Sequence, residues 1–404
     1  MSDEGDGNEG GVDGARRLPG AEAVAAASER DGEGVACAFC RLPVPETPVE
    51  ATLDGQQRAF CSQACADAYE RADAAFDEYH GNRRVEPGVS ALDASLPEGY
   101  PRNAFVLVPG EAGTRDRAVG AELVWRTLQR GEPVVFVSFQ EPPGAVVQQF
   151  LTLEWNVLPY LESGLFHIID CFTYRLDDRD RMFDRMDDWN GHLYDVAEDA
   201  TTTVRDPTDV GEVHNKLDNA LEDRDMVDQG LVIVDSLTEL GTLVQPVRAY
   251  NFVKDIRADI CKGRFVPIFA GATISAGSAD QFPHDLQYTI DGLIELRLND
   301  EIVPNTLVKQ VRIRKLNGAL VVPEWHAYEY APGTGMVTFD PEAELREKRE
   351  EDGEPSAEAN AADADDPETA RADDGGPSAE DDGADPVRKE GAAADDPTAG
   401  PSDG

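Results

Sequence analysis

Four cysteines have the spacing of a metal site. Two residues separate Cys37 from Cys40, three separate Cys61 from Cys65, and twenty lie between the pairs. Four thiolates can complete the tetrahedral coordination of Zn²⁺, and a C-x2-C turn presents two sulfurs from one bend. The sequence predicts a zinc site held by Cys37, Cys40, Cys61 and Cys65, structural rather than sensory or catalytic. Redox pairs or unpaired structural thiols are the alternatives.

A second stretch, "VPGEAGTRDRAV", has the position of a phosphate-binding loop, because it follows the apolar run "AFVL" and precedes a helical pattern. A working loop reads G-x-x-x-x-G-K-[ST], in which lysine contacts phosphate and the hydroxyl holds Mg²⁺. With Gly110 as its first glycine, Asp116 takes the place of lysine. A carboxylate there repels phosphate by about 1–4 kcal/mol at ~4 Å.

The other changes in this loop place Arg115 at the second glycine and Arg117 at the hydroxyl position. A side chain at residue 115 restricts the backbone where glycine is wanted. The loop residues that remain as candidate nucleotide contacts are Gly110, Gly113 and Thr114.

The cysteines belong to a small block, residues 35–80. Within it, "VEATLDGQQRAF" predicts a hairpin about Asp54-Gly55, and "SQACADAYERADAAFDEY" predicts a helix that places Cys61 and Cys65 on one face. A block of about 45 residues buries little core, so we expect a metal to supply most of its stability. Residues 1–34, which precede this block, and residues 342–404, at the other end of the sequence, are acidic and are expected to be disordered.

Residues 83–341 alternate strand and helix patterns, which predicts a mostly parallel sheet with flanking helices. Helices are expected at Arg117–Leu128 and Ala249–Cys261, and within "DDRDRMFDRMDDWNGHLYDVAED" and "HNKLDNALEDR", with "TTTVRDPTD" as a loop between the last two. Near one edge, "TLVKQVRIRKL" predicts an antiparallel hairpin. The expected strands are Phe105–Val108, Val134–Phe139, Leu165–Ile169, Leu231–Val234, Val266–Ala270 and Gly292–Leu296.

The cysteine block resembles the TRASH-type zinc domain and the related MYM-type fingers. Cys37, Cys40, the segment "AFCSQAC" and the following Tyr69 match that pattern over about a tenth of the chain. The resemblance implies a treble-clef-like fold and a role in metal sensing, trafficking or protein contact.

Residues 83–341 resemble the KaiC-like branch of the RecA superfamily. Five segments match in order: "GVSALDASLPEGYPRNAFVLVPG", "GEPVVFVSFQEPP", "WNVLPYLESGLFHIID", "GLVIVDSLTEL" and "VRIRKLNGALVVPEWHAYEYAPGTGMVTF". The resemblance implies a RecA-like fold that belongs to an ATPase family.

The resemblance also assigns roles. Asp235 stands where the family holds the Mg²⁺ shell, and Gln140 replaces the first residue of the Glu-Glu pair, of which Glu141 remains. An amide cannot accept a proton from water. Lys315 matches the lysine that reaches a neighbour's nucleotide, and Asn317 replaces its arginine partner. The altered positions point together to lost ATP hydrolysis, and we assign no catalytic residue.

The amino-acid composition also bears on the source of the protein and on the partners it can bind. The formal net charge is −44, and 29 of the 36 basic residues are arginine. Such acidity is expected of a protein from a salt-loving archaeon, and it disfavours nucleic-acid binding. The absence of a long apolar run or leader pattern predicts a cytoplasmic protein, whose cysteines remain thiols or metal ligands.

We therefore expect a non-catalytic regulatory protein that acts through protein contacts or self-association, with Zn²⁺ as cofactor and ATP unlikely to bind. Two alternatives stay open: a weak or partner-completed ATPase, and a metal-responsive factor that acts through the zinc domain.

Overall fold

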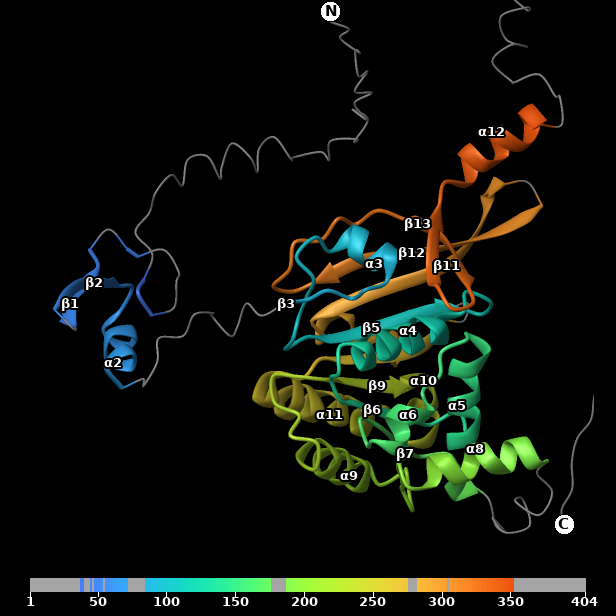
Figure 1. Cartoon of the computed structure of the whole chain (residues 1–404), viewed down its shortest axis with the longest axis horizontal. Helices are drawn as coiled ribbons and strands as arrows, with labels where there is room; N and C mark the ends of the chain where they lie inside the picture. Colours follow the sequence, from blue (N-terminus) through green and yellow to red (C-terminus); the bar gives the residue numbers. More distant parts are fainter. Residues whose placement is uncertain are drawn as a thin grey trace, which may run out of the picture. The chain divides into compact units, whose positions relative to one another are not determined.

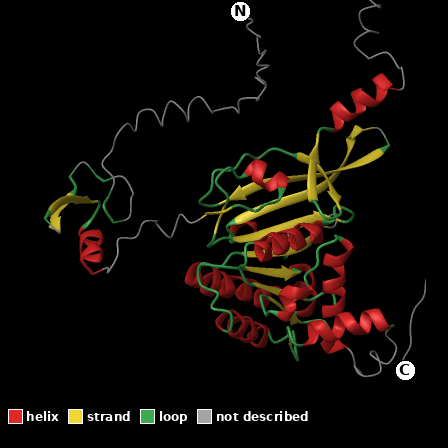
Figure 2. Cartoon of the chain, in the orientation of Figure 1, coloured by secondary structure: helices red, strands yellow, loops and turns green. Residues whose placement is uncertain are grey.

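A ten-stranded sheet organises most of the chain (Figures 1 and 2). The computed structural model describes residues 37–39, 44–45, 47–53, 55–71, 84–175, 187–274, 282–303 and 305–351. Across the sheet, the order of strands is β14-β13-β12-β11-β5-β10-β9-β6-β7-β8. Their bounds are β5 Phe105–Glu111, β6 Val134–Ser138, β7 Phe166–Asp170, β8 Thr201–Thr203, β9 Leu231–Asp235, β10 Ile268–Ile274, β11 Gly292–Val303, β12 Thr306–Leu316, β13 His326–Ala331 and β14 Gly335–Phe339.

The sheet is parallel from β11 to β8 and antiparallel from β11 to β14. Central strands such as "VVFVS" and "LVIVD" are buried at every position, as expected of β-branched strands covered on both faces. All six predicted strands are confirmed, and so is the mostly parallel sheet. The hairpin predicted at "TLVKQVRIRKL" is formed by β11 and β12, which pair antiparallel. Two further antiparallel strands, β13 and β14, extend the sheet beyond it.

Helices cover both faces of the sheet (Figure 1). On one face, α4 (Asp116–Gln129) packs against the central strands, joined by α5 (Pro143–Thr152), α6 (Leu158–Glu162) and α8 (Asp188–Glu198). The other core contains α9 (Val210–Glu222), α10 (Leu237–Leu243) and α11 (Pro246–Ile256), which a π-helical segment, Arg257–Arg264, continues. The lead-in forms β3 (Arg84–Val85), α3 (Ser90–Ser95) and β4 (Tyr100–Pro101), while short 3-10 helices span Thr173–Arg175 and His284–Tyr288.

Two segments differ from the sequence-based expectation. Thr201–Thr203, expected to be a loop, forms β8, because β7 offers a free edge and Ile168 pairs with the β-branched Thr201. Pro341–Glu351 forms α12, inside the tail expected to be disordered, and the Asp340 carboxylate accepts hydrogen bonds from the backbone of Glu342 and Ala343. The first part of the helix predicted within residues 177–199 lies outside the described residues, as do residues 1–36 and 352–404.

The cysteine block forms a hairpin and a helix. Strands β1 (Val49–Leu53) and β2 (Gln56–Phe60) pair antiparallel, and α2 (Gln63–Arg71) follows. The hairpin is confirmed, and so is the helix as far as Arg71. Cys61 precedes α2 rather than lying within it. Among the described residues of this block, the buried core consists of Cys37, Phe60 and Ala66, a set too small to stabilise a fold by apolar burial.

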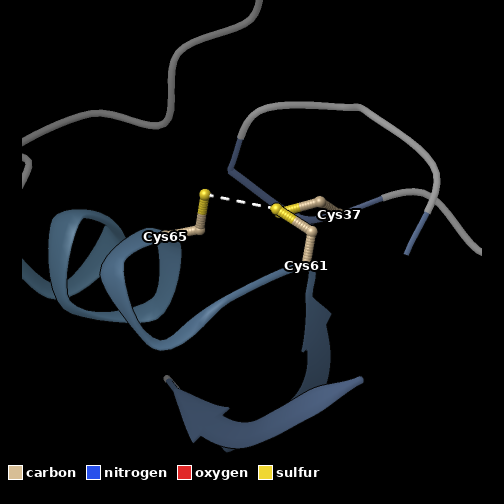
Figure 3. A group of neighbouring side chains, drawn as sticks. All are labelled: Cys37, Cys61 and Cys65. Atoms are coloured by element: carbon tan, nitrogen blue, oxygen red, sulfur yellow. Dashed lines mark hydrogen bonds between the residues drawn. The ribbon is translucent and has the colours of Figure 1, made fainter. Parts of the chain in front are cut away.

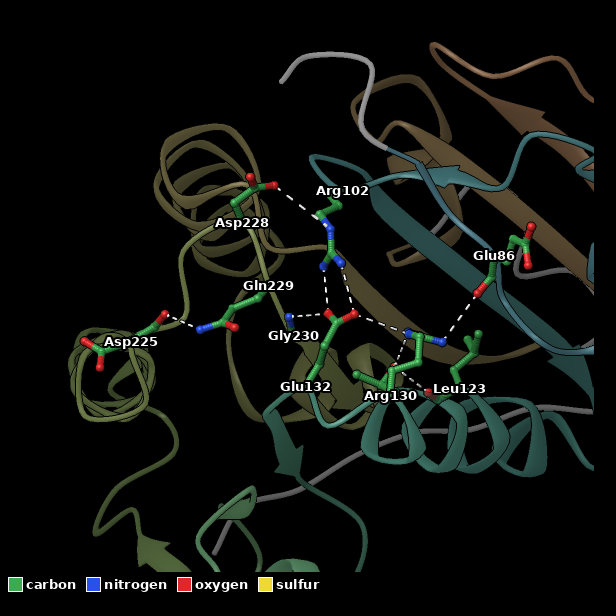
Figure 4. Close-up of polar contacts among 10 residues, drawn as sticks. Glu86, Arg102, Leu123, Arg130, Glu132, Asp225, Asp228, Gln229 and Gly230 are labelled. Atoms are coloured by element: carbon green, nitrogen blue, oxygen red, sulfur yellow. Dashed lines mark hydrogen bonds and ion pairs between the residues drawn. The ribbon is translucent and has the colours of Figure 1, made fainter. Parts of the chain in front are cut away.

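An ion-pair network joins the segments that lead into β5, β6 and β9, three strands near the centre of the sheet (Figure 4). The Arg102 guanidinium binds the Glu132 carboxylate through two contacts, at 2.8 and 3.0 Å. Glu132 also accepts a 2.8 Å hydrogen bond from the Gly230 amide and lies 3.3 Å from Arg130. Burial alone would raise the pKa of Glu132, but these donors outweigh it and lower that pKa. The network holds together the N-terminal ends of β5, β6 and β9.

Replacing Glu132 by glutamine is expected to lower the free energy of unfolding by about 2–3 kcal/mol, because two arginines lose their buried partner. Since the folded pKa is lowered, the stabilisation is present above the unfolded pKa of glutamate and disappears as the pH falls below it. Denaturant unfolding of E132Q and of the exposed control E98Q at pH 7.5 and pH 4 measures the effect. Equal stability of the two variants at pH 7.5 would contradict this role.

Candidate functional site

The candidate nucleotide residues meet where β5 turns into α4. We call Gly110–Arg117 the phosphate loop. A Cβ placed on Gly110 would lie 2.4 Å from the Cβ of Asp116 and 2.9 Å from the Oγ1 of Thr114, so only glycine fits there. Gly113 has a φ of 99° and Arg115 a φ of 57°, both in the left-handed region. The loop therefore keeps a tight turn, even with arginine where glycine is favoured.

Thr114 is fully buried and is bound within its own chain. Its Oγ1 donates to the Glu111 carbonyl at 2.7 Å. Its carbonyl accepts a 2.5 Å hydrogen bond from the hydroxyl of Tyr328 on β13. These contacts fix the loop against the antiparallel strands, at the end of β5.

Arg117 forms the main ion pairs of the site. Its Nη2 lies 2.9 Å from Oδ2 of Asp235, and its Nε donates to the same oxygen at 3.0 Å. Its Nη1 lies 3.2 Å from Oε1 of Glu141. Asp235 ends β9, and its side chain is only 8% exposed. Burial raises the pKa of Asp235, an effect that the Arg117 guanidinium opposes. A guanidinium thus binds the carboxylate assigned to the Mg²⁺ shell.

Asp116 is a second acidic group beside this pair. Burial, followed by the charge of Asp235, raises the pKa of Asp116 to about 6. Backbone hydrogen bonds from Arg117 and from Asp116 itself, together with the Arg117 charge, oppose the rise. With Arg117 and Asp235, Asp116 lines a small cavity beneath α4 whose other walls are apolar apart from two glycines. The site holds three carboxylates and one guanidinium, an excess of negative charge that disfavours phosphate.

The catalytic and trans-acting positions, including the retained Lys315, also have partners within the chain. The Gln140 amide donates to the Ser236 hydroxyl at 2.7 Å. The Lys315 amine donates to the Gln287 carbonyl at 2.7 Å. The backbone amide of Asn317 donates to the Asp291 carbonyl. Because residue 140 is glutamine, no carboxylate stands at this position to activate water.

Three cysteines converge in the small block (Figure 3). The Sγ atoms of Cys37, Cys61 and Cys65 all lie within 4.8 Å of one another, and those of Cys61 and Cys65 are 3.5 Å apart. Tetrahedral zinc with Zn–S bonds near 2.3 Å requires sulfurs about 3.8 Å apart, so this cluster fits the ion. Cys40, the fourth predicted ligand, lies outside the described residues.

The structure brings Gly110, Gly113, Thr114 and Asp235 to one end of the sheet, as the sequence predicts. Sequence reasoning missed the contacts of Arg117 with Asp235 and of Tyr328 with Thr114. The two residues of the first pair are 118 positions apart in the chain and those of the second pair are 214 apart, and no local pattern marks such pairs. Only the unusual charge of Arg117 at a hydroxyl position signalled that a counter-charge was needed.

Asp116→Asn is expected to stabilise the protein at pH 7.5 by about 1–2 kcal/mol. Because the folded pKa is raised, ionisation disfavours folding as the pH rises from about 4 to 6, and that penalty persists above pH 6. The titratable groups that interact with Asp116 are Arg117, Asp235, Tyr328 and Tyr330. Unfolding curves between pH 4 and 8 measure the difference, which should vanish near pH 4. A gain that does not depend on pH would contradict the ionisation account.

A parallel sheet with a tight loop between β5 and α4, and an aspartate ending β9 beside it, defines the RecA-type P-loop fold. The chain belongs to the KaiC ATPase family: the family model described as "ATPase: KaiC" matches residues 85–343, well over half of the chain.

Curated relatives match a similar share of the chain. A UPF0273 protein of Thermotoga maritima is 25% identical over 264 residues, which span 64% of this chain and 97% of the relative. One from Aeropyrum pernix is 28% identical, over 63% and 93%. The solved structure of a KaiC-like protein of Pyrococcus horikoshii aligns with a TM-score of 0.49 at 17% identity, over 64% and 99%. None of the described helices is long and apolar enough to cross a membrane.

Proposed function

We propose that this KaiC-family domain does not run an ATP hydrolysis cycle and serves as a regulatory protein that acts through protein contacts. The observation that supports this most strongly is the Arg117 guanidinium, 2.9 Å from Asp235 and 3.2 Å from Glu141. It supplies, from within the chain, the positive charge that Mg²⁺ would bring to these carboxylates. A metal ion would have to displace a partly buried ion pair to reach Asp235.

The other replacements agree with this assignment. Asp116 stands where lysine would neutralise phosphate, and Gln140 stands where a carboxylate would orient water. Asp116 weakens phosphate binding, Arg117 weakens metal binding and Gln140 removes water activation. A single replacement could be offset by a partner protein, whereas all three together remove the reaction.

The cysteine block is proposed to be a structural zinc module. Three thiols lie within coordination distance of one ion, and the block has almost no apolar core of its own. Closed thiolate sites hold zinc for stability and leave no position open for a substrate. In this proposal the module provides a folded surface for protein contact. It does not supply a reaction centre.

ATP turnover tests the main proposal. The full chain is assayed with Mg²⁺ and ATP at low and at molar KCl, beside Asp235→Asn. Release of phosphate by the wild type should equal that of Asp235→Asn under both conditions. Turnover that Asp235→Asn abolishes would overturn the proposal and favour the ATPase that the family description names. A combined Arg115→Gly, Asp116→Lys, Arg117→Thr and Gln140→Glu variant shows whether the fold can still support hydrolysis.

A further inference from the structure

The side chain of Asp116 turns back over the phosphate loop. It belongs to the first residue of α4, and it packs so closely on Gly110 that a Cβ there would lie 2.4 Å from its Cβ and 3.0 Å from its Cγ. Gly110 and Asp116 are the first residue of the motif and the residue at the lysine position. The side chain therefore packs over the start of the loop, where it is partly buried and lines the small cavity beneath α4.

The carboxylate meets donors that serve bound phosphate in this kind of loop. Backbone hydrogen bonds from Arg117 and from Asp116 itself favour its ionised form. These amides begin a fourteen-residue helix, whose N-terminal end attracts anions. Arg117, the next residue, brings a cation to Asp235. Two adjacent residues thus place one negative and one positive charge where an external anion and its metal ion would be bound.

We propose that Asp116 is an internal ligand of the phosphate loop, which keeps the loop closed to free oxyanions. The inference rests on the proposed function and adds a reason for it: the loop is already occupied by a group of the same chain. The hydrogen bond from Tyr328 to the Thr114 carbonyl ties the loop to β13 in this form.

Phosphate binding tests the internal ligand directly. Inorganic phosphate is titrated into the full-length wild type, Asp116→Ala and Asp116→Asn, with KCl adjusted to constant ionic strength. Binding is followed by calorimetry and by the shift in thermal midpoint. Alanine removes both the group and its charge, whereas asparagine removes the charge and keeps the volume. Glu329→Gln, which removes a nearby half-exposed carboxylate outside the loop, is the control for general electrostatics.

Asp116→Ala should bind phosphate at least tenfold more tightly than the wild type. Asp116→Asn should fall between the two, because it removes the charge but keeps the volume, and Glu329→Gln should stay within threefold of the wild type. The inference is overturned if Asp116→Ala, folded as judged by its unfolding transition, binds no more tightly than the wild type. It is also overturned if Asp116→Asn matches Asp116→Ala, since charge alone would then explain the exclusion. No nucleotide is used, so the internal ligand can fail while ATP turnover remains absent, and the reverse also holds.

Discussion

Replacing Arg117 by methionine is expected to lower the free energy of unfolding at pH 7.5 by about 3–5 kcal/mol. The substitution keeps most of the apolar stem but leaves Asp235, Glu141 and Asp116 without their common counter-charge. Of the three, Asp235 costs the most free energy to leave unpaired, because its side chain is only 8% exposed. As the pH falls, Asp116 and Asp235, whose pKa values burial raises, become protonated, so the loss should shrink between pH 7.5 and pH 5. Denaturant unfolding at the two pH values measures both effects.

Arg115→Met is the matched control for this variant. Arg115 is two residues away, carries the same charge and is 56% exposed, and its ion pair with Glu329 is 3.9 Å long. Such a pair contributes about 0–1 kcal/mol, so Arg115→Met should be nearly neutral. Similar losses in the two variants would show that the local net charge matters and that the Arg117 ion pairs do not.

Arg117→Ser adds a second readout. It restores a hydroxyl at the position where the P-loop motif holds Mg²⁺ and frees the two carboxylates that Arg117 binds. We expect its thermal midpoint to rise with added Mg²⁺, whereas that of the wild type should not change. If Mg²⁺ stabilises the wild type as much as the variant, Arg117 does not occupy the place of the metal.

Replacing Cys37 by serine is expected to reduce bound zinc from about one ion per chain to nearly none and to unfold the small block. The Sγ of Cys37 lies within 4.8 Å of those of Cys61 and Cys65, and among the described residues of the block Cys37 is one of three buried apolar residues, with Phe60 and Ala66. Structural zinc contributes about 10 kcal/mol or more to such units, far more than this core can supply.

Elemental analysis of purified protein and limited proteolysis measure this effect. Cys37→Ser should lose zinc and be cleaved within residues 44–71. Cys171→Ala, which alters a buried thiol at the end of β7, should keep its zinc and resist cleavage there. A wild type without metal would remove the zinc proposal, and a Cys37→Ser variant that stays resistant would show that the metal does not hold the block together.

The sequence was most informative where one local signal decided the structure. Apolar β-branched runs identified all six predicted strands, and the turn at Asp54-Gly55 identified the hairpin of the small block. Prediction failed at Thr201–Thr203, where pairing with the edge of β7 outweighs a polar composition typical of loops. At 342–351, charge composition pointed to disorder, although Pro341, the Asp340 cap and the Glu and Arg residues favour a helix.

The candidate site was only half predictable for a related reason. The residues of the phosphate loop are contiguous, so their replacement could be read directly from the sequence. The meaning of Arg117 depends on Asp235 and Glu141, which reach it only because β9 and β6 are neighbours in the sheet. From the sequence, Arg117 was a lost hydroxyl. In the structure it is the counter-charge of Asp235 and Glu141.

Binding of MgATP, measured by calorimetry on the full chain, tests the central claim most directly. Titrations of the wild type with ATP, with and without Mg²⁺, are run in molar KCl beside Asp235→Asn. No saturable binding below millimolar ATP is expected for the wild type, and Mg²⁺ should make no difference. Micromolar, Mg²⁺-dependent binding that Asp235→Asn removes would show that Arg117 and Asp116 yield to the nucleotide, and it would contradict the account.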